Sequence, residues 1–149
     1  MVSRILVATD GSETAWKAVK FAVELAKQTG AIITALSVTD RTSFLTKSVP
    51  AMSTPTHIIE PVEDYMRQAA EAYLGKAEGL CRKSDIKVRK VIRTGHPVDE
   101  IVKEAERSRA DLIIMGSRGR GIVRSAVLGS ITFGVMNKES KIPLLVIRK

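Results

Sequence analysis

The chain has 149 residues, of which 44% are hydrophobic and 27% are charged. These values are typical of one globular domain with a core of ordinary size, so we expect a single domain over residues 1–149 without a tail. The apolar runs are no longer than strands, and the first residues lack the long apolar region of a signal peptide. The sequence therefore predicts a soluble, cytoplasmic protein that does not cross a membrane. A lone cysteine, Cys81, excludes an internal disulfide framework, and its place on an apolar helical stripe predicts a core residue.

The formal net charge of +8 favours anionic partners, which include both nucleotides and nucleic acids. Three Phe, two Tyr and one Trp are few for a surface that stacks bases, so a nucleic-acid partner is not expected. Lys87, Arg89, Lys90 and Arg93 are interleaved with apolar residues. This pattern is typical of the solvated outer face of an edge strand, where Lys and Arg also discourage aggregation.

The first part of the chain predicts a strand, a helix and a second strand. Residues 5–8 form a continuous apolar run, as expected of a parallel strand covered on both faces. Ser12 is a suitable N-cap for the following helix, in which apolar residues recur at helical spacing until Gly30 ends it. Residues 31–38 form the second strand.

The stretch from Thr39 to Glu60 leaves the carboxyl end of this second strand and is rich in Ser and Thr, with two prolines and His57. A connection of this length without regular structure is usually functional or disordered. We expect a variable loop that serves as a lid or as a partner-binding segment over a ligand, with plain disorder as the alternative.

The rest of the chain continues the alternation of helices and strands. Apolar residues from Val62 to Cys81 trace a long second helix, and residues 86–93 form a third strand. Pro97 opens a third helix after His96, for which we expect a local hydrogen-bonding role rather than catalysis. The remaining elements are, in order, a strand over 112–115, a glycine-rich loop, a helix from about Ser130 and a strand over 144–147.

Five strands that alternate with four helices predict an α/β fold, a doubly wound parallel sheet with helices on both faces. In such sheets a ligand binds beyond the carboxyl ends of the strands. Residues 9–11, Val38 and residues 115–116 all fall at such ends. We therefore expect them to converge on one crevice.

The most informative motif is the glycine-rich run over residues 116–130, which contains Arg118, Arg120 and Arg124. Glycines let the backbone approach a ligand, arginines donate to phosphates at any pH, and a helix start near Ser130 presents free N–H groups to an anion. The run therefore predicts a nucleotide site. It fits neither the P-loop nor the dinucleotide fingerprint, and a solvated basic loop or a relative of RNA-binding Arg-Gly segments is the alternative.

The same run has the spacing Gly-x-x-Gly-x9-Gly-Ser, as Gly116, Gly119, Gly129 and Ser130. Further stretches of note are Ile-Leu-Val-Ala-Thr-Asp-Gly-Ser at 5–12, Gly-His-Pro at 95–97, Ala-Asp-Leu-Ile-Ile-Met-Gly-Ser-Arg-Gly at 110–119 and Ile-Pro-Leu-Leu-Val-Ile at 142–147. With these pieces the chain resembles, from Val2 to Arg148, the universal stress protein family, whose ATP-binding members share the glycine spacing. The resemblance implies a sheet of order 3-2-1-4-5, bound ATP, and a homodimer formed by pairing of the last strands, Leu144 to Ile147.

The resemblance also implies a role for each matching residue. Adenine is expected against three residues, which are Ala8, Val38 and Met115. The phosphates are expected against the glycine loop and the helix start, which are Gly116, Gly119, Gly129, Ser130 and Ile131. By residue type Ser130 is expected both to be the N-cap of this helix and to donate to a phosphate. Asp10, next to Thr9, would contact the ribose or a hydrated Mg²⁺ or Mn²⁺ ion held mainly by the phosphates. Arg118 and Arg120 are further candidates, with ordinary solvent-facing arginines as the alternative.

The function expected from these features is binding itself, in a stress-response or signalling protein that ATP regulates as a ligand. One alternative is a slow ATPase or autophosphorylating enzyme, with Asp10 or Ser130 near the γ-phosphate and a metal ion neutralising charge. A second alternative is a protein-partner or nucleic-acid module that uses the basic surface.

Gly134 departs from the expected pattern, because glycine inside a helix costs about 1 kcal/mol relative to alanine. The last helix is therefore expected to be short or irregular.

Overall fold

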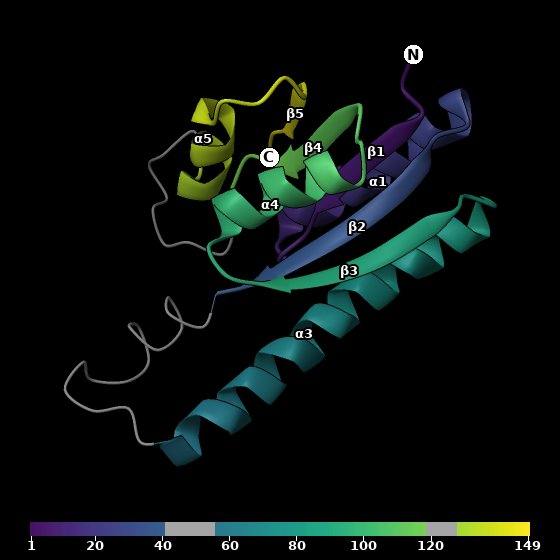
Figure 1. Cartoon of the computed structure of the whole chain (residues 1–149). Helices are drawn as coiled ribbons and strands as arrows, with labels where there is room; N and C mark the ends of the chain where they lie inside the picture. The colour runs from purple at the N-terminus through teal and green to yellow at the C-terminus, as the bar shows by residue number, and fades with distance from the viewer. Residues whose placement is uncertain (41–55, 119–127) are drawn as a thin grey trace.

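The computed structural model describes residues 1–40, 56–118 and 128–149, with side chains from residue 61 onward in the second range. In these ranges five parallel strands form one sheet in the order β3-β2-β1-β4-β5 (Figure 1). The strands are β1 (Arg4–Ala8), β2 (Ile32–Thr39), β3 (Val88–Thr94), β4 (Leu112–Gly116) and β5 (Leu144–Ile147). The helices are α1 (Glu13–Thr29), α3 (Thr56–Lys83), α4 (Pro97–Arg107) and α5 (Ser130–Asn137). The predicted α/β fold and its strand order are confirmed.

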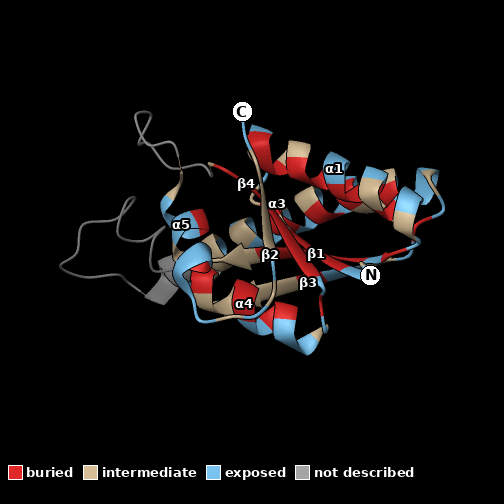
Figure 2. Ribbon diagram, turned by 90° about the horizontal axis from the view of Figure 1, so that it is seen from above, coloured by how far each residue is buried: buried red, intermediate tan, exposed pale blue. Residues whose placement is uncertain are grey.

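Each face of the sheet has its own apolar core. Along β1, Ile5 and Val7 join the cluster under α1 and α3, whereas Leu6 joins the cluster under α4 and α5. Successive side chains of a strand point to opposite faces, which is why a strand covered on both sides reads as a continuous apolar run. Figure 2 shows α1 and α4 on opposite sides of the sheet, with buried positions on their inner faces.

Helix α1 begins and ends where the sequence predicts. The Ser12 side chain accepts a hydrogen bond from the Ala15 N–H at 3.3 Å, as an N-cap does. Gly30 has φ of 76° and donates its N–H to the Ala26 carbonyl, which closes the helix in the left-handed conformation that favours glycine. The Ser12 cap fixes the turn that precedes α1, which belongs to the predicted site.

Helix α3 begins at Thr56, so the expected irregular connection from Thr39 to Glu60 is wrong for residues 56–60. The apolar periodicity predicts a start at Val62, just after Pro61, which cannot donate a backbone N–H. Pro61 is the sixth residue of α3, so its missing N–H removes a backbone hydrogen bond after the first turn, and the helix nevertheless continues through it. The N-terminal half of α3 extends past the carboxyl ends of the strands (Figure 1). The proposed lid over residues 41–55 lies outside the described residues.

Helix α5 is short, with eight residues, and Gly134 stands inside it. A Cβ at Gly134 would lie 2.6 Å from Cγ2 of Val98, a buried residue at the start of α4. The glycine therefore lets α5 pack closely on α4, and this contact compensates for its low helix propensity. The sequence predicted a short helix, but not this reason for the glycine.

Strands β3 and β5 form the two edges of the sheet. The predicted edge position of residues 87–93 is confirmed, with the strand running from Val88 to Thr94. The predicted single solvated face is wrong, because Arg89 and Arg93 pair with Glu104 of α4, whereas Lys90 pairs with Glu78 of α3. Cys81 is 1% exposed, as expected of a core residue. Among the helices of the described ranges, none has the length and apolar character required to span a bilayer.

Candidate functional site

The first part of the candidate site is the turn between β1 and α1. Thr9 is buried, and its N–H donates to the Leu36 carbonyl at 2.9 Å, which holds the end of β1 beside β2. Asp10 Oδ1 accepts the Ser12 N–H at 2.9 Å. Gly11 has φ of 80°, and a Cβ there would collide with the ring of Tyr73 from α3. Only glycine combines this backbone conformation with so close a neighbour, so the turn is rigidly placed.

The second part is the end of β4, which lies directly against the start of α1. A Cβ at Gly116 would lie 2.6 Å from the backbone carbon of Thr14 and 2.8 Å from the Ala15 nitrogen. The Thr14 hydroxyl donates to the Arg118 carbonyl, and the Ser12 hydroxyl donates to the same oxygen at 3.4 Å. Gly116 is thus required for the contact of two backbones, and two hydroxyls at the start of α1 hold the base of the glycine loop.

The third part is the N-terminus of α5. The Gly129 N–H donates to the Ser117 carbonyl at 2.6 Å, and the Thr132 hydroxyl donates to the Gly116 carbonyl at 2.8 Å. Gly129 is the N-cap and Ser130 the first helical residue. The expectation that Ser130 is itself the N-cap is therefore wrong by one residue, because Gly129 adopts the extended conformation of a cap, with φ of −67° and ψ of 158°.

The structure brings most of the predicted residues to one end of the sheet. Ala8, Val38 and Met115 lie near the carboxyl ends of β1, β2 and β4, and Val38 is half-buried. Asp10 and Arg118 lie in segments joined through the Ser12 hydroxyl, and Ser130 and Ile131 are exposed at the start of α5. Two predicted phosphate contacts, Gly119 and Arg120, lie outside the described residues.

The residues that hold these parts together were not predicted from the sequence. Thr14 and Thr132 are 5% and 3% exposed, and each donates to a carbonyl at or just after the end of β4. Ser117 accepts from Gly129 and donates its N–H to the Ile147 carbonyl at 2.7 Å. The available signal was a hydroxyl residue in the first turn of each of these two helices. Their hydrogen-bond partners could not be predicted, because they are distant in sequence.

A groove of about 270 Å³ lies between α4, α5 and β5. Val135, Met136 and Leu144 contribute to its lining, and the predicted nucleotide-binding residues do not. Within the described ranges, no three His, Cys, Asp or Glu side chains gather as a metal cluster.

The comparisons with known proteins identify the family of the chain. The model of the universal stress protein family matches residues 1–148. Universal stress protein MJ0531 of Methanocaldococcus jannaschii is 30% identical over 149 residues, which cover 100% of this chain and 84% of that protein. The structure of MJ0577 has a TM-score of 0.86 and 29% identity, and the match covers 100% of this chain and 97% of that one.

Two further structures share the fold at lower identity. One is a universal stress protein in complex with cAMP, with a TM-score of 0.68, 20% identity and coverage of 99% of this chain and 97% of that chain. The other is the universal stress protein of Archaeoglobus fulgidus in complex with dAMP, with a TM-score of 0.67, 19% identity and coverage of 99% and 98%. The match of the family model along nearly the whole sequence, together with the similarity to MJ0531, shows that the chain belongs to the universal stress protein family.

Proposed function

We propose that the chain binds ATP as a regulatory ligand at the carboxyl ends of β1, β2 and β4, as part of a stress response. The observation that carries this proposal is the N-terminus of α5, which Ser117 and Thr132 tie to the end of β4 beside the β1–α1 turn. Two relatives of this fold have been solved with adenine nucleotides, cAMP and dAMP.

Two of the helix N-termini at this end of the sheet, those of α1 and α5, differ in a way that supports a phosphate site on α5. In α1, the Ser12 side chain caps the helix and Glu13 complements its dipole. In α5, the cap is Gly129, which has no side chain, and the first turn carries no acidic residue. The N–H groups of Ser130 and Ile131 are among the four that a helix leaves without an intrahelical partner. A phosphate is the natural acceptor for them.

The remaining contacts of the proposed nucleotide follow from the same geometry. The adenine would rest against Val38 and the backbone at Ala8 and Met115, where the ends of three neighbouring strands meet. Asp10 would contact the ribose or a hydrated Mg²⁺ or Mn²⁺ ion. Gly119 and Arg120 would complete the phosphate loop. We also propose a cytoplasmic homodimer through β5, whose four residues are half-buried at the edge of the sheet.

The experiment that tests this proposal is calorimetric titration of nucleotide-free protein with ATP and with AMP, with and without Mg²⁺. Because the proposed contacts of α5 are with phosphates, ATP should bind more tightly than AMP, and a hydrated metal ion should strengthen the ATP complex. Absence of binding heat with both nucleotides would overturn the proposal. Equal affinity for both would show that the β- and γ-phosphates add nothing to binding, and it would overturn ATP as the specific ligand.

A further inference from the structure

Three arginines surround one buried carboxylate between α4 and β3, on the side of α4 that faces away from α5. Glu104 of α4 is 0% exposed, and its Oε2 accepts from Arg89 Nη2 at 2.8 Å. Its Oε1 accepts from Arg93 Nε at 2.9 Å and lies 3.7 Å from Arg107 Nη1. Arg89 and Arg93 come from β3, so the network joins the edge strand to the helix beside it.

The three guanidinium groups carry more positive charge than the single Glu104 carboxylate can neutralise. One carboxylate faces three cations, and the arginine side chains are 55%, 39% and 54% exposed for Arg89, Arg93 and Arg107. A guanidinium carries five N–H donors in a planar fork, which fits a carboxylate with two parallel hydrogen bonds. Glu104 takes one hydrogen bond from each of Arg89 and Arg93 and fixes their orientation. Solvent reaches the rest of each fork, so these two groups are preorganised to receive an anion.

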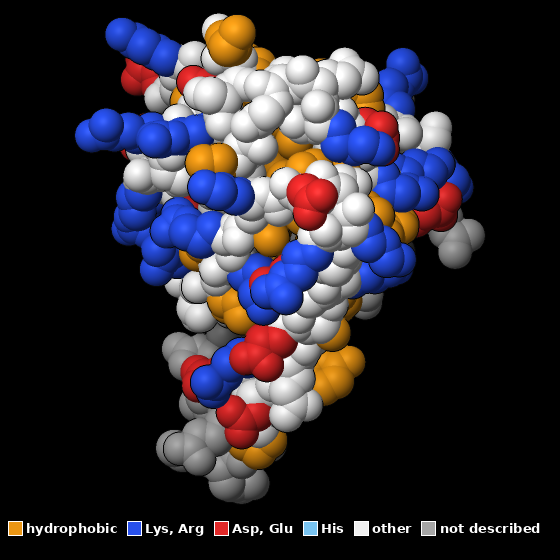
Figure 3. All heavy atoms as spheres, turned by 90° about the vertical axis from the view of Figure 1, so that its right-hand side faces the viewer, with side chains coloured by type: hydrophobic (Ala, Val, Ile, Leu, Met, Phe, Trp, Pro, Cys, Tyr) orange, Lys and Arg blue, Asp and Glu red, His pale blue; other side chains and the backbone are white. Residues whose placement is uncertain are grey.

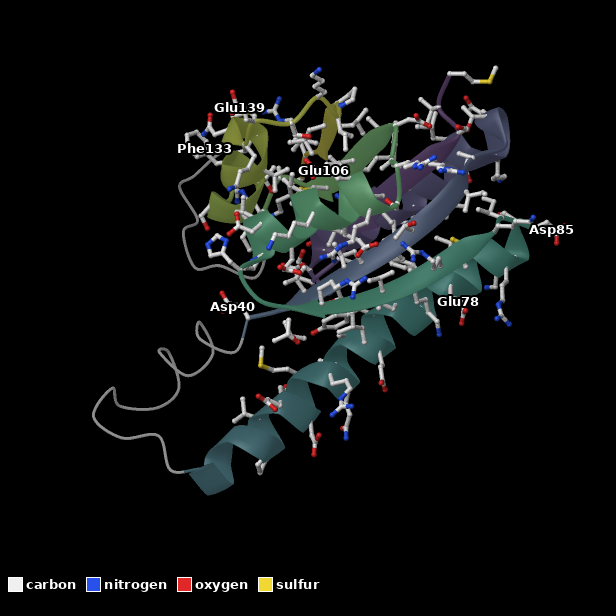
Figure 4. The ribbon with its side chains drawn as sticks, in the orientation of Figure 1. Asp40, Glu78, Asp85, Glu106, Phe133 and Glu139 are labelled. Atoms are coloured by element: carbon white, nitrogen blue, oxygen red, sulfur yellow. The ribbon has the colours of Figure 1, made fainter. Side chains whose placement is uncertain are left out.

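Further cations surround this network. Lys87, just before β3, and Lys103, on the outer side of α4, are exposed. Residues 86–95 contain four Lys or Arg and no Asp or Glu. Figure 3 views the end of the molecule at which β3 begins, and Lys and Arg side chains predominate over Asp and Glu there. Nitrogen-tipped side chains lie between α4 and β3 on the near side of the sheet (Figure 4).

We propose that this β3–α4 basic surface, defined as Lys87, Arg89, Arg93, Lys103 and Arg107, docks an acidic segment of a partner protein. Charge complementarity selects the partner, since Asp and Glu side chains match the arginine forks. A second copy of the chain does not pair edge to edge here, because its β3 carries the same cations and would be repelled.

The surface favours an acidic protein segment over a nucleic acid. A phosphate backbone is bound along a continuous cationic track, usually with aromatic side chains that stack on bases. Here α4 also carries Asp99, Glu100 and Glu106, and Glu100 Oε2 lies 3.7 Å from Lys103 Nζ, within the surface itself. The charged area is therefore short, and it suits a few carboxylates better than a long polyanion.

No predicted nucleotide-binding residue lies on β3 or α4, although Arg93 pairs in register with Val38 of β2 and so lies beside that site. Lys87 and Lys103 are not among the predicted nucleotide-binding residues, so a test that changes only these two lysines can fail independently of ATP binding. On the opposite face of β3, Lys90 pairs with Glu78 of α3, labelled in Figure 4, at 3.2 Å. That pair lies outside the proposed surface and serves to keep β3 on α3.

The first test is binding of a fluorescent, extended peptide of alternating Glu and Ser residues, measured by anisotropy against the same peptide with Gln in place of Glu. The Glu peptide should bind at least tenfold more tightly, and raising NaCl from about 50 mM to about 500 mM should remove most of this preference. Equal binding of the two peptides would overturn the proposal. An oligonucleotide that displaces the Glu peptide and binds more tightly would also overturn it, in favour of a polyanion site.

The second test locates the site. Lys87→Glu/Lys103→Glu changes two exposed cations without touching the Glu104 network, and it should weaken binding of the Glu peptide about tenfold. Lys20→Glu/Lys27→Glu on α1, which covers the other face of the sheet, makes the same change in net charge and should weaken it less than about twofold. An equal loss in both variants would overturn the proposal.

In NMR titrations of the unaltered protein, the side-chain N–H signals of Arg89 and Arg93 should shift with the Glu peptide, and unmoved signals would count against docking there.

Discussion

At the scale of single residues, Gly129 gives the sharpest test of the phosphate site. Its φ of −67° and ψ of 158° are open to any residue, so Gly129→Val should fold. The added side chain would occupy the space in front of the first N–H groups of α5. At ATP about a hundredfold above Kd, binding should stabilise the unaltered protein by about 2.7 kcal/mol, and the variant should lose this gain. Thermal melting with and without ATP measures it, and an ATP-induced shift retained in the variant would exclude the site.

Gly116 and Gly75 form a matched pair for testing the close backbone contact beneath the loop. Gly116→Ala should destabilise the fold by about 1–3 kcal/mol, because the new Cβ would meet the backbone of Thr14, which cannot yield without moving α1. Gly75 lies in α3, where an added Cβ would meet none of the described neighbours within 4 Å. Gly75→Ala should instead stabilise by about 0.5–1 kcal/mol through helix propensity. Urea unfolding compares the two, and similar effects of the same sign would contradict the packing described for Gly116.

At the scale of the elements, the Glu104 network decides how firmly α4 holds β3. Glu104→Gln keeps the shape of the side chain but removes the charge that three arginines face. We expect a loss of about 2 kcal/mol in the free energy of unfolding, typical of hydrogen bonds to charged groups. Urea unfolding measures it, with Glu106→Gln on the exposed side of the same helix as the control. If both substitutions had the same small effect, Glu104 would not join the two elements.

The N-terminus is held to β4 by Asp111, and this gives the pH prediction. Asp111 Oδ2 accepts from the Ser3 N–H, the Ser3 hydroxyl and the Arg4 N–H at 2.9 to 3.0 Å, and these hydrogen bonds lower the pKa of the carboxyl group. A lowered pKa in the folded state means that the carboxylate stabilises the fold above its ordinary pKa and that this contribution disappears as pH falls. Asp111→Asn should therefore destabilise at about pH 7, with the difference shrinking below about pH 4. A difference independent of pH would exclude the charge as its cause.

The predictable part of the fold consists of local features. The Ser12 and Gly30 caps and the alternating strands and helices follow from residue types at short spacing, and they were sufficient for the α/β class. The start of α3 was missed because Pro61 suggests a helix boundary, whereas α3 continues through it. The reason for Gly134 was missed because Val98 lies far away in sequence.

In the candidate site, too, local sequence patterns were predictable and long-range contacts were not. The glycine spacing and the strand ends indicated where a nucleotide would bind, because both are patterns in sequence. The hydroxyls of Thr14 and Thr132 act on carbonyls 104 and 16 residues away, and such pairings exist only once the sheet has formed. The Glu104 network was missed for the same reason, since Arg89 and Arg93 are read from sequence as solvated edge cations.

At the scale of the whole molecule, the two edges of the sheet should behave differently. The edge formed by β3 carries cations that repel a second copy, whereas β5 consists of Leu144, Leu145, Val146 and Ile147. An apolar edge strand is stable in water when another chain covers it, so β5 is the edge expected to pair in a homodimer. Sedimentation at increasing concentration should then show a dimer.

Hydrogen exchange can assign that dimer to its edge, with β3 as the internal control. In a strand at the edge of a sheet, alternate N–H groups point away from the neighbouring strand. Pairing through β5 should slow exchange of its outward N–H groups as protein concentration rises, because they then donate to the second copy. The outward N–H groups of β3 should exchange quickly at every concentration. Protection that appears at β3 instead would place the interface on the basic edge, and that result would contradict both the β5 dimer and the charge argument against self-association through β3.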